Sequence, residues 1–195
     1  MSTKINSFVV ADPAKCIGCK VCEVACAVSH TNYGVVTAGT MEDPVIPRLY
    51  LVKTAEVTMP VQCRHCEDAP CANVCPVGAI SQEDNVIVVN EADCVGCKTC
   101  MMACPFGAID LVPKYVKGEE VTQRVLKTET EEGLVEKAVA YASKCDLCIS
   151  RPDGPACVEN CPEKALEIVK PVALKKERNR DAAISLLESV KKFME

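Results

Sequence analysis

The chain has 195 residues, enough for one compact domain or two small ones, and a formal net charge of -5. Aromatic residues make up only 4% and Trp is absent, whereas 16 residues are cysteine. Large aromatic side chains therefore cannot supply most of the core, and the cysteines become the candidates for holding the chain together. The acidic balance, without a basic stripe interleaved with aromatics, excludes a nucleic-acid partner.

The N-terminal segment precedes the first cysteine and carries one short apolar run, Phe8–Ala11. A secretory signal needs a longer apolar stretch and a cleavage site, and neither is present. No twin-arginine pair occurs, and no window approaches the roughly 18 apolar residues of a membrane span. These absences predict a soluble, cytoplasmic protein. Cytosolic thiols stay reduced, so dense cysteine favours metal binding over disulfides.

The remaining elements follow in chain order from apolar runs and turn residues. Residues 27–47 contain turn residues and two prolines and are expected to form a surface loop. Strands are predicted at 8–11, 48–57, 86–89 and 109–112, followed by a hairpin that pairs 121–127 with 134–141 across a polar turn at 128–133. The stretches NSFVVADPAKCIGC and NVIVVNEADCVGC form an internal repeat, as do VCPVGAI and ACPFGAI. The pattern predicts an α+β fold built from a duplicated unit.

The C-terminal segment, 173–195, lacks cysteine and is predicted to be an amphipathic helix. Ile184, Leu187, Val190 and Met194 lie near one face, and the first half of the segment is basic. Such a helix can pack on its own domain or dock on another subunit, and we favour docking or self-assembly. Its charges exclude a membrane span.

The 16 cysteines fall into four groups of four, with none left over. The groups are Cys16, Cys19, Cys22 and Cys26; Cys63, Cys66, Cys71 and Cys75; Cys94, Cys97, Cys100 and Cys104; and Cys145, Cys148, Cys157 and Cys161.

The first and third groups have the spacing C-x2-C-x2-C-x3-C, which is typical of bacterial ferredoxins. Three closely spaced thiolates cap one cubane, and the fourth cysteine, expected where a helix begins, ligates the other cluster of a pair. The second and fourth groups have longer gaps before their third cysteine. Proline follows the fourth cysteine at Pro76, Pro105 and Pro162, where it should end the local helix, but the first group has Ala27.

Structural zinc and disulfides are the alternatives to iron. Zinc sites also use pairs of C-x2-C units, but zinc ribbons rarely take three ligands within seven residues. Four complete quartets, two of them with this spacing, favour 4Fe–4S clusters over both alternatives.

Several other residues lie near the cysteine groups. His65 either tunes a cluster by hydrogen bonding or packs its loop, and loop packing is favoured. His30 is expected at the surface, and Met101 and Met102 are expected to pack near a cluster. Lys20 and Lys98 either offset cluster charge or simply face solvent. The sequence contains no Ser/His/Asp set, GxGxxG motif or phosphate loop, so no catalytic residues are predicted.

The chain resembles the four-cluster ferredoxin-like electron-transfer subunits of formate dehydrogenase, formate hydrogenlyase and hydrogen-dependent CO2 reductase complexes. The matching stretches, within residues 1 to about 170, are FVVADPAKCIGCKVCEVAC, QCRHCEDAPCANVCPVGAIS, CVGCKTCMMACPFGAI and KCDLCISRPDGPACVENCP. The resemblance implies four 4Fe–4S clusters in tandem, nested two-cluster modules. It implies an outer lobe from about 1–60 plus 140–170, an inner lobe at about 61–112, an inserted hairpin at about 113–143, and the helix 171–195 as an assembly element.

The resemblance also implies which cysteines share a cluster. Cys16, Cys19 and Cys22 would share one with Cys161, and Cys145, Cys148 and Cys157 one with Cys26. Cys63, Cys66 and Cys71 would pair with Cys104, and Cys94, Cys97 and Cys100 with Cys75.

The function implied is electron relay between a formate dehydrogenase-type catalytic subunit and a hydrogenase or another iron–sulfur partner, with no catalysis by this chain. Two alternatives stay open at this point. The chain is a freely diffusing polyferredoxin, or it stores or delivers clusters during maturation.

Overall fold

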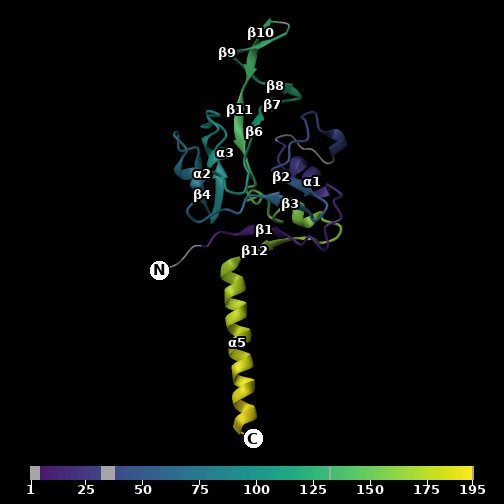
Figure 1. Ribbon diagram of the computed structural model, residues 1–195, viewed down its shortest axis with the longest axis vertical. Coiled ribbons are helices and arrows are strands. Elements are labelled where there is room, and N and C mark those ends of the chain that lie inside the picture. Colours follow the sequence, from purple (N-terminus) through teal and green to yellow (C-terminus); the bar gives the residue numbers. More distant parts are fainter. Residues whose placement is uncertain (1–4, 32–37, 132, 195) are drawn as a thin grey trace.

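The computed structural model describes residues 5–31, 38–131 and 133–194. Figure 1 shows a central body with a hairpin projecting at one end and a long helix at the other. Within these ranges the body combines four short α-helices with strands that pair two by two in antiparallel sheets. The body thus contains both helices and strands, which is consistent with the predicted α+β class.

The first and last strands along the chain pair with each other. β1 (Phe8–Ala11) lies antiparallel to β12 (Leu166–Val169), with Val9 opposite Ile168. Val9 is fully buried, which explains why an apolar run forms a strand at this point. The predicted strand at 8–11 is confirmed. The pairing carries the first cysteine group next to the last one.

The predicted strand at 48–57 is wrong in its second half. β2 (Leu49–Lys53) ends at a tight turn, and β3 (Thr58–Gln62) returns antiparallel to it. The Thr54 hydroxyl accepts hydrogen bonds from the N–H groups of Glu56 and Val57, at 3.2 and 3.0 Å. A side-chain oxygen bonded to the backbone in this way stabilises a turn without glycine or proline.

A second hairpin was predicted only in part. β5 (Val86–Val89) coincides with the predicted strand, and its partner β4 (Ile80–Glu83) was not predicted. Asp84 and Asn85 between them both have positive φ, at 45° and 64°. Asp and Asn tolerate this left-handed conformation, which two-residue hairpins require.

The helices begin earlier than expected. α1 (Val21–Ser29), α2 (Pro70–Asn73), α3 (Thr99–Ala103) and α4 (Ala156–Glu159) each start one residue before the third cysteine of a group. The expectation that a helix begins at the fourth cysteine is wrong. The three helices that end before their fourth cysteine are those with a proline after it, because proline disfavours helical geometry in the preceding residue.

The first group has alanine in place of that proline, and α1 continues through Cys26 to Ser29. Ala27 is buried, so the predicted surface loop at 27–47 is wrong at its start. Residues 38–40 form a short 3-10 helix, η1 (Ala38–Thr40). The part of that predicted loop at 32–37 lies outside the described residues.

The helices pack in two pairs. α1 packs against α4, and α2 packs against α3. Figure 1 shows the first pair on one side of the body and the second on the other, with β6 (Asp110–Pro113) and β11 (Ala140–Ser143) between them. These two strands pair with each other, Val112 opposite Tyr141, which corrects the predicted strand at 109–112 by one residue.

The segment between β6 and β11 contains two hairpins instead of the single one predicted. β7 (Tyr115–Val116) pairs with β8 (Glu119–Glu120), and β9 (Thr122–Thr130) pairs with β10 (Gly133–Ala138). The strands of the larger hairpin extend through most of the predicted turn at 128–133. The predicted strand 134–141 divides at Val139, after which β11 turns to pair with β6.

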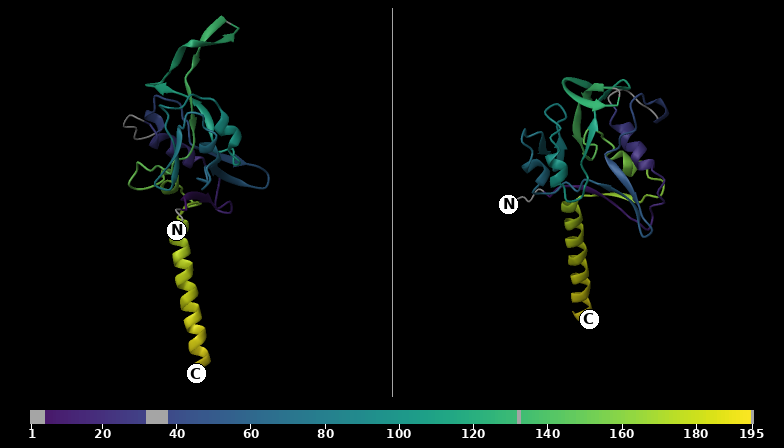
Figure 2. Two further views of the ribbon diagram at one scale, coloured as in Figure 1. Left: turned by 90° about the vertical axis from the view of Figure 1, so that its left-hand side faces the viewer. Right: turned by 45° about the horizontal axis from the view of Figure 1, so that its top comes forward.

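α5 (Pro171–Met194) is the predicted C-terminal helix. It begins with proline, which suits the first helical position because no backbone partner is needed there. Figures 1 and 2 show it extending away from the body in every view. Every residue from Val172 to Lys191 is exposed. Within the described ranges, none of the helices combines the length and apolar content that a membrane span requires.

Because α5 projects from the body, we expect the body to fold without it. Truncation after Pro171 should shift the thermal unfolding midpoint by only about 1–2 °C, since changes at exposed surface typically alter stability by about 0.5 kcal/mol or less. Circular dichroism melting of the full-length and truncated proteins, both prepared anaerobically, measures this. A fall of more than about 5 °C would contradict the separation of helix and body.

Candidate metal centres

The cysteine loops of the first and third groups have the same backbone shape. In each loop a glycine and the following lysine adopt positive φ, Gly18 and Lys20 in the first, Gly96 and Lys98 in the third. A Cβ added at Gly96 would lie 2.7 Å from the carbonyl oxygen of Ala140 in β11. The loop therefore needs glycine both for its conformation and for its close approach to the neighbouring strand.

Two quartets of thiols line separate cavities. One cavity is bounded by Cys16, Cys19, Cys22 and Cys161, which we call quartet A. The other is bounded by Cys94, Cys97, Cys100 and Cys75, which we call quartet D. In each, three cysteines come from one loop and the fourth from a different group.

The remaining cysteines gather in the same way. Burial raises the pKa of the Cys71 thiol to about 11, and the charges of Cys63 and Cys104 add to the rise. Burial raises the pKa of Cys66 as well, and the charges of Cys63 and Cys104 add to this rise. Cys63 and Cys71 each belong to a buried core, and Cys104 packs against both of these cores. We call Cys63, Cys66, Cys71 and Cys104 quartet C.

The fourth set is the most enclosed. Burial raises the pKa of Cys157 to about 12, and the neighbouring charges of Cys26 and Cys148 add to it. Burial also raises the pKa of Cys145, together with Cys26 and Cys157. Cys26, Cys145, Cys148 and Cys157 are all buried, and we call them quartet B.

Backbone amides point at several of these sulfur atoms. The N–H of Arg48 donates to Cys26 at 3.3 Å and that of Ala142 donates to Cys94 at 3.3 Å. In both the third and fourth groups, the amide four residues after the last cysteine donates to it, Ala108 to Cys104 and Ala165 to Cys161. Such donors favour a thiolate over a thiol, which suits metal ligation.

The donor sets fit 4Fe–4S clusters. All 16 cysteines are free, and each quartet supplies four sulfur ligands with no histidine or carboxylate among them. Four buried thiolates at one point repel one another unless a cation or a cationic cluster core lies between them. Four cysteine ligands per cluster is the requirement of a 4Fe–4S centre.

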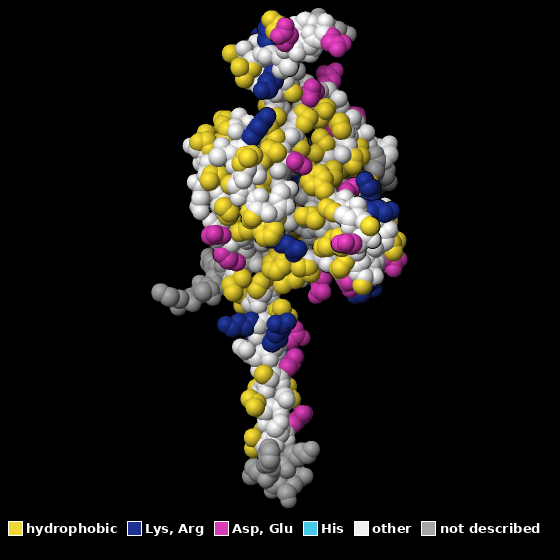
Figure 3. Space-filling view, viewed as in Figure 1, with side chains coloured by type: hydrophobic (Ala, Val, Ile, Leu, Met, Phe, Trp, Pro, Cys, Tyr) yellow, Lys and Arg dark blue, Asp and Glu magenta, His cyan; other side chains and the backbone are white. Residues whose placement is uncertain are grey.

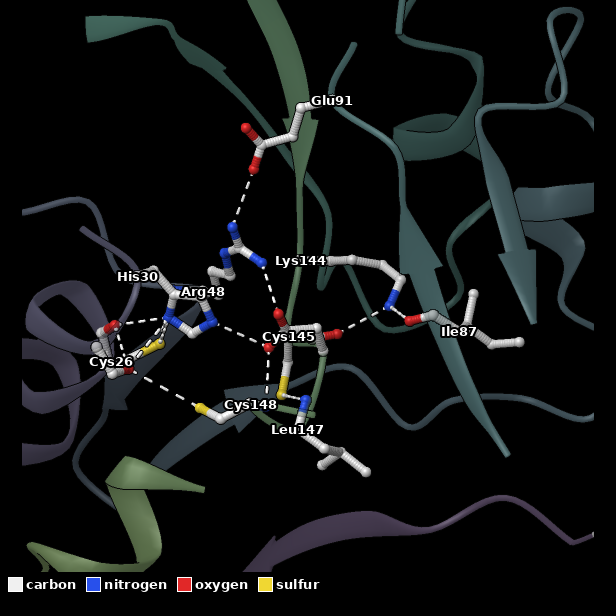
Figure 4. Close-up of polar contacts among 11 residues, drawn as sticks. Cys26, His30, Arg48, Ile87, Glu91, Lys144, Cys145, Leu147 and Cys148 are labelled. Atoms are coloured by element: carbon white, nitrogen blue, oxygen red, sulfur yellow. Dashed lines mark hydrogen bonds and ion pairs between the residues drawn. The ribbon is translucent and has the colours of Figure 1, made fainter. Parts of the chain in front are cut away.

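A network of charged side chains supports quartet B. Asp146, between Cys145 and Cys148, accepts from Arg48 at 2.9 Å and pairs with His30 at 3.0 Å. Arg48 also contacts Glu91, which follows β5, at 3.0 Å, and Figure 4 shows Arg48 reaching toward it. The network joins α1, β2, the fourth cysteine group and the segment after β5.

The expectation that His30 is a surface residue is wrong. Burial opposes a charge on His30, but its hydrogen bonds to Asp146, Cys148 and Cys26 outweigh burial and raise its pKa to about 12. Burial opposes ionisation of Asp146 too, yet His30 and Arg48 lower its pKa. The ring Nδ1 lies 3.7 Å from the Cys26 sulfur. His30 thus places its ring beside Cys26 and Cys148 of quartet B.

His65 packs its loop, as favoured from the sequence. It is 1% exposed, and its Nδ1 accepts a hydrogen bond from the Ile87 N–H at 3.0 Å. Burial and the charge of Lys144 lower its pKa to about 3, so the ring is neutral. Asn6, also buried, donates to the His65 carbonyl at 2.8 Å and fixes the loop from the N-terminal side.

The other flanking residues divide between surface and interior. Lys20 and Lys98 are exposed, and Lys20 lies 3.6 Å from Glu23. Met101 packs against the side chains around quartet D, as expected. Met102 does not, because it is 87% exposed on the outer side of α3.

Sequence reasoning missed Arg48, Lys144 and Asp146. Lys144 directly precedes Cys145, and Asp146 lies between Cys145 and Cys148. A charged residue so close to the cysteines was a signal that the sequence offered. The sequence offered no such signal for Arg48, because its partners Glu91 and Asp146 come from distant segments of the chain.

Comparison with known proteins shows which family the chain belongs to. Residues 54–124 and residues 93–166 each match a family described as a 4Fe-4S dicluster domain. Residues 13–32 match a family described as a 4Fe-4S binding domain. The Escherichia coli electron transport protein HydN is 44% identical over 83% of this chain and 87% of its own length. The chain belongs to this family of 4Fe–4S electron-transport proteins.

Two further relatives from Escherichia coli strain K12 are named as components of larger complexes. Hydrogenase-4 component A is 42% identical over 92% of this chain and 91% of its own length. Formate hydrogenlyase subunit 2 is 41% identical over 85% of this chain and 82% of its own length. The family carries electrons through 4Fe–4S clusters, so this chain is an electron-transfer protein and not itself a catalytic enzyme.

The charged network around Asp146 should stabilise the loaded protein. Arg48→Ala removes two ion pairs from partly buried positions and leaves Asp146 with one cation. We expect a loss of about 2 kcal/mol, and thus a thermal midpoint lower by about 4–8 °C, reduced from the full buried-pair value because these side chains keep some exposure. Visible absorbance of the clusters during heating measures it.

Lys15→Ala is the matched control for this prediction. Lys15 pairs with Asp12 at 3.6 Å at the exposed surface, where such pairs contribute little. Its midpoint should stay within about 2 °C of the wild type. An equal loss in both variants would show that the network around Asp146 has no special role.

Proposed function

We propose that this chain relays electrons through four 4Fe–4S clusters between a formate dehydrogenase-type catalytic subunit and a hydrogenase or other iron–sulfur partner in the cytoplasm. The observation that carries the proposal is that two cavities are each lined by four cysteines, three from one group and the fourth from another. When bound, each cluster supplies reversible one-electron storage. The chain supplies the ligands, the amide donors and the buried surroundings.

Quartets A, B, C and D are the proposed ligand sets. In each, three cysteines of one group join the fourth cysteine of another, so the first and fourth groups form an outer lobe around an inner lobe made by the second and third. Two cavities, each lined by four cysteines, support the assignment for A and D. The pairing of β1 with β12 supports the closing of the outer lobe.

The burial of the ligands supports an order along the relay. Quartets A and D each contain one exposed cysteine, Cys19 and Cys97, so they suit the two ends. Quartets B and C contain none, so they suit the middle. The charge of Cys22 in quartet A raises the pKa of Cys157 in quartet B, so these two quartets are neighbours. Cys63 of quartet C and Cys145 of quartet B share one buried core, so these two quartets are also neighbours.

The proposed partners follow from the names of the relatives and from α5. Hydrogenase-4 component A and formate hydrogenlyase subunit 2 are named as parts of hydrogenase and formate hydrogenlyase assemblies. α5 exposes Ile184, Leu187 and Val190, and Figure 3 shows Lys and Arg side chains gathered where the helix leaves the body. An exposed amphipathic helix of this kind supports docking on another subunit or self-assembly.

The ligand assignment predicts a shared loss in two distant variants. Cys16→Ser and Cys161→Ser should each perturb the same cluster, because both thiols belong to quartet A. Electron paramagnetic resonance of the reduced proteins should show the same signal altered in both. Cys26→Ser is the control, since it should alter a different signal. Different losses in Cys16→Ser and Cys161→Ser would overturn the nested arrangement.

Anaerobic purification at native expression level tests the relay itself. We expect about 16 irons per chain, as four clusters require, together with a formate dehydrogenase or hydrogenase chain. The truncation after Pro171 should keep the iron and yield a smaller assembly. About 16 irons on a lone protein would instead indicate a diffusing carrier, and transfer of clusters to an apo acceptor would indicate a maturation role. Zinc in place of iron would overturn the assignment.

A further inference from the structure

Lys144 is a buried cation at the centre of the body. It lies between β11 and Cys145, and it is only 2% exposed. Its ammonium group donates hydrogen bonds to the carbonyl oxygens of Ile87 and Cys145, the second at 2.8 Å. Figure 4 shows the side chain extending from the fourth cysteine group toward Ile87.

This ammonium has no carboxylate partner among the residues that the structure describes. Asp146 lies two residues along the chain, but its two carboxylate oxygens already contact His30 and Arg48. A buried charge is costly unless an opposite charge compensates it, and two neutral carbonyl groups supply only partial charges. A lysine side chain is long enough to reach solvent from many positions, and this one stays inside.

The two hydrogen bonds place Lys144 between quartets B and C. Cys145 is a member of quartet B. Ile87 donates its own N–H to His65, which lies between Cys63 and Cys66 of quartet C. The ammonium, the Ile87 peptide and the His65 ring therefore form one connection from the loop of one quartet to the loop of the other.

Lys144 contacts the surroundings of both quartets. Its ammonium donates to the carbonyl of Cys145 in quartet B, and it donates to the carbonyl of Ile87, which shares a buried core with Cys71 of quartet C. Other cations lie near these two quartets as well. Arg64, between Cys63 and Cys66, donates to the Val9 carbonyl, and His30 and Arg48 both engage Asp146 on the side of quartet B.

We propose that the Lys144 ammonium is the shared counter-charge of the two central clusters and raises the reduction potential of both. The proposal rests on the proposed ligand sets B and C. A 4Fe–4S cluster with four thiolates carries a charge of about -2 when oxidised and about -3 when reduced. A fixed positive charge at low dielectric stabilises the reduced form more, and one placed between two clusters also weakens their mutual repulsion.

The test compares charge-changing variants of the loaded, full-length protein. Lys144→Met removes the charge and keeps a similar length, whereas Lys144→Arg keeps the charge. Lys98→Met is the matched control, because Lys98 is an exposed lysine next to Cys97 and solvent screens its charge. Redox titration followed by electron paramagnetic resonance gives the midpoint potential of each cluster.

We expect two of the four midpoint potentials to fall in Lys144→Met, by more than any potential falls in Lys98→Met. The same two signals should be those altered by Cys26→Ser and Cys66→Ser. Lys144→Arg should leave all four close to the wild type. Four unchanged potentials in Lys144→Met, with iron content retained, would overturn the counter-charge role and leave the proposed relay intact. Wild-type protein without either central cluster would overturn both.

If Lys144→Met loses its central clusters, Lys144→Gln and Lys144→Arg still test the role of the charge. Glutamine is neutral but can donate one hydrogen bond, so a loaded Lys144→Gln protein should show the same two potentials lowered. If neither neutral variant retains the central clusters, retention of all four in Lys144→Arg supports the need for charge. Loss in Lys144→Arg as well would show that only the lysine shape matters, which overturns the proposal.

Discussion

The proposed thiolate ligation, which joins distant parts of the chain, is the constraint on which the rest of this structure depends. In each proposed ligand set, three cysteines of one group meet a fourth from another group, so the chain must bring its ends together before any set is complete. The pairing of β1 with β12 and the contact of α1 with α4 satisfy this requirement. Since the buried core contains so few large apolar side chains, we expect metal binding and folding to be coupled. The short helices and two-stranded sheets are frames for the loops more than independent sources of stability.

Burying sulfur ligands that carry negative charge creates a second demand, which the chain meets in three ways. Backbone amides donate to individual sulfur atoms, as Ala108 does to Cys104. His30 lies beside Cys26 and Cys148, held by an aspartate that Arg48 shares. Lys144 has no carboxylate partner among the described residues, and it lies where two ligand sets approach each other. Charge compensation is thus concentrated around the buried quartet B and its neighbour, where solvent cannot screen the clusters.

The sequence predicted the chemistry better than the local structure. Cysteine spacing has a direct physical meaning, so the four groups and their iron–sulfur character could be inferred from residues alone. The turn after β2 could not, because Thr54 stabilises it through its hydroxyl and the stretch contains neither glycine nor proline. The β4 strand could have been inferred from Asp84 and Asn85, a pair that favours a hairpin turn. The ion pairs of Arg48 lay beyond sequence reasoning because they join segments that no local pattern connects.

The surface separates the places suited to electron transfer from those suited to assembly. Cys19 and Cys97 are the exposed cysteines, and the apolar neighbours Ile17 and Val95 are 65% and 64% exposed beside them. An electron entering or leaving the proposed relay crosses least protein at these two loops. α5 and the β9–β10 hairpin project from the body in other directions (Figure 2). A two-stranded hairpin alone is marginally stable in water, and an amphipathic helix alone leaves its apolar face exposed. Both projections therefore gain most from a partner surface.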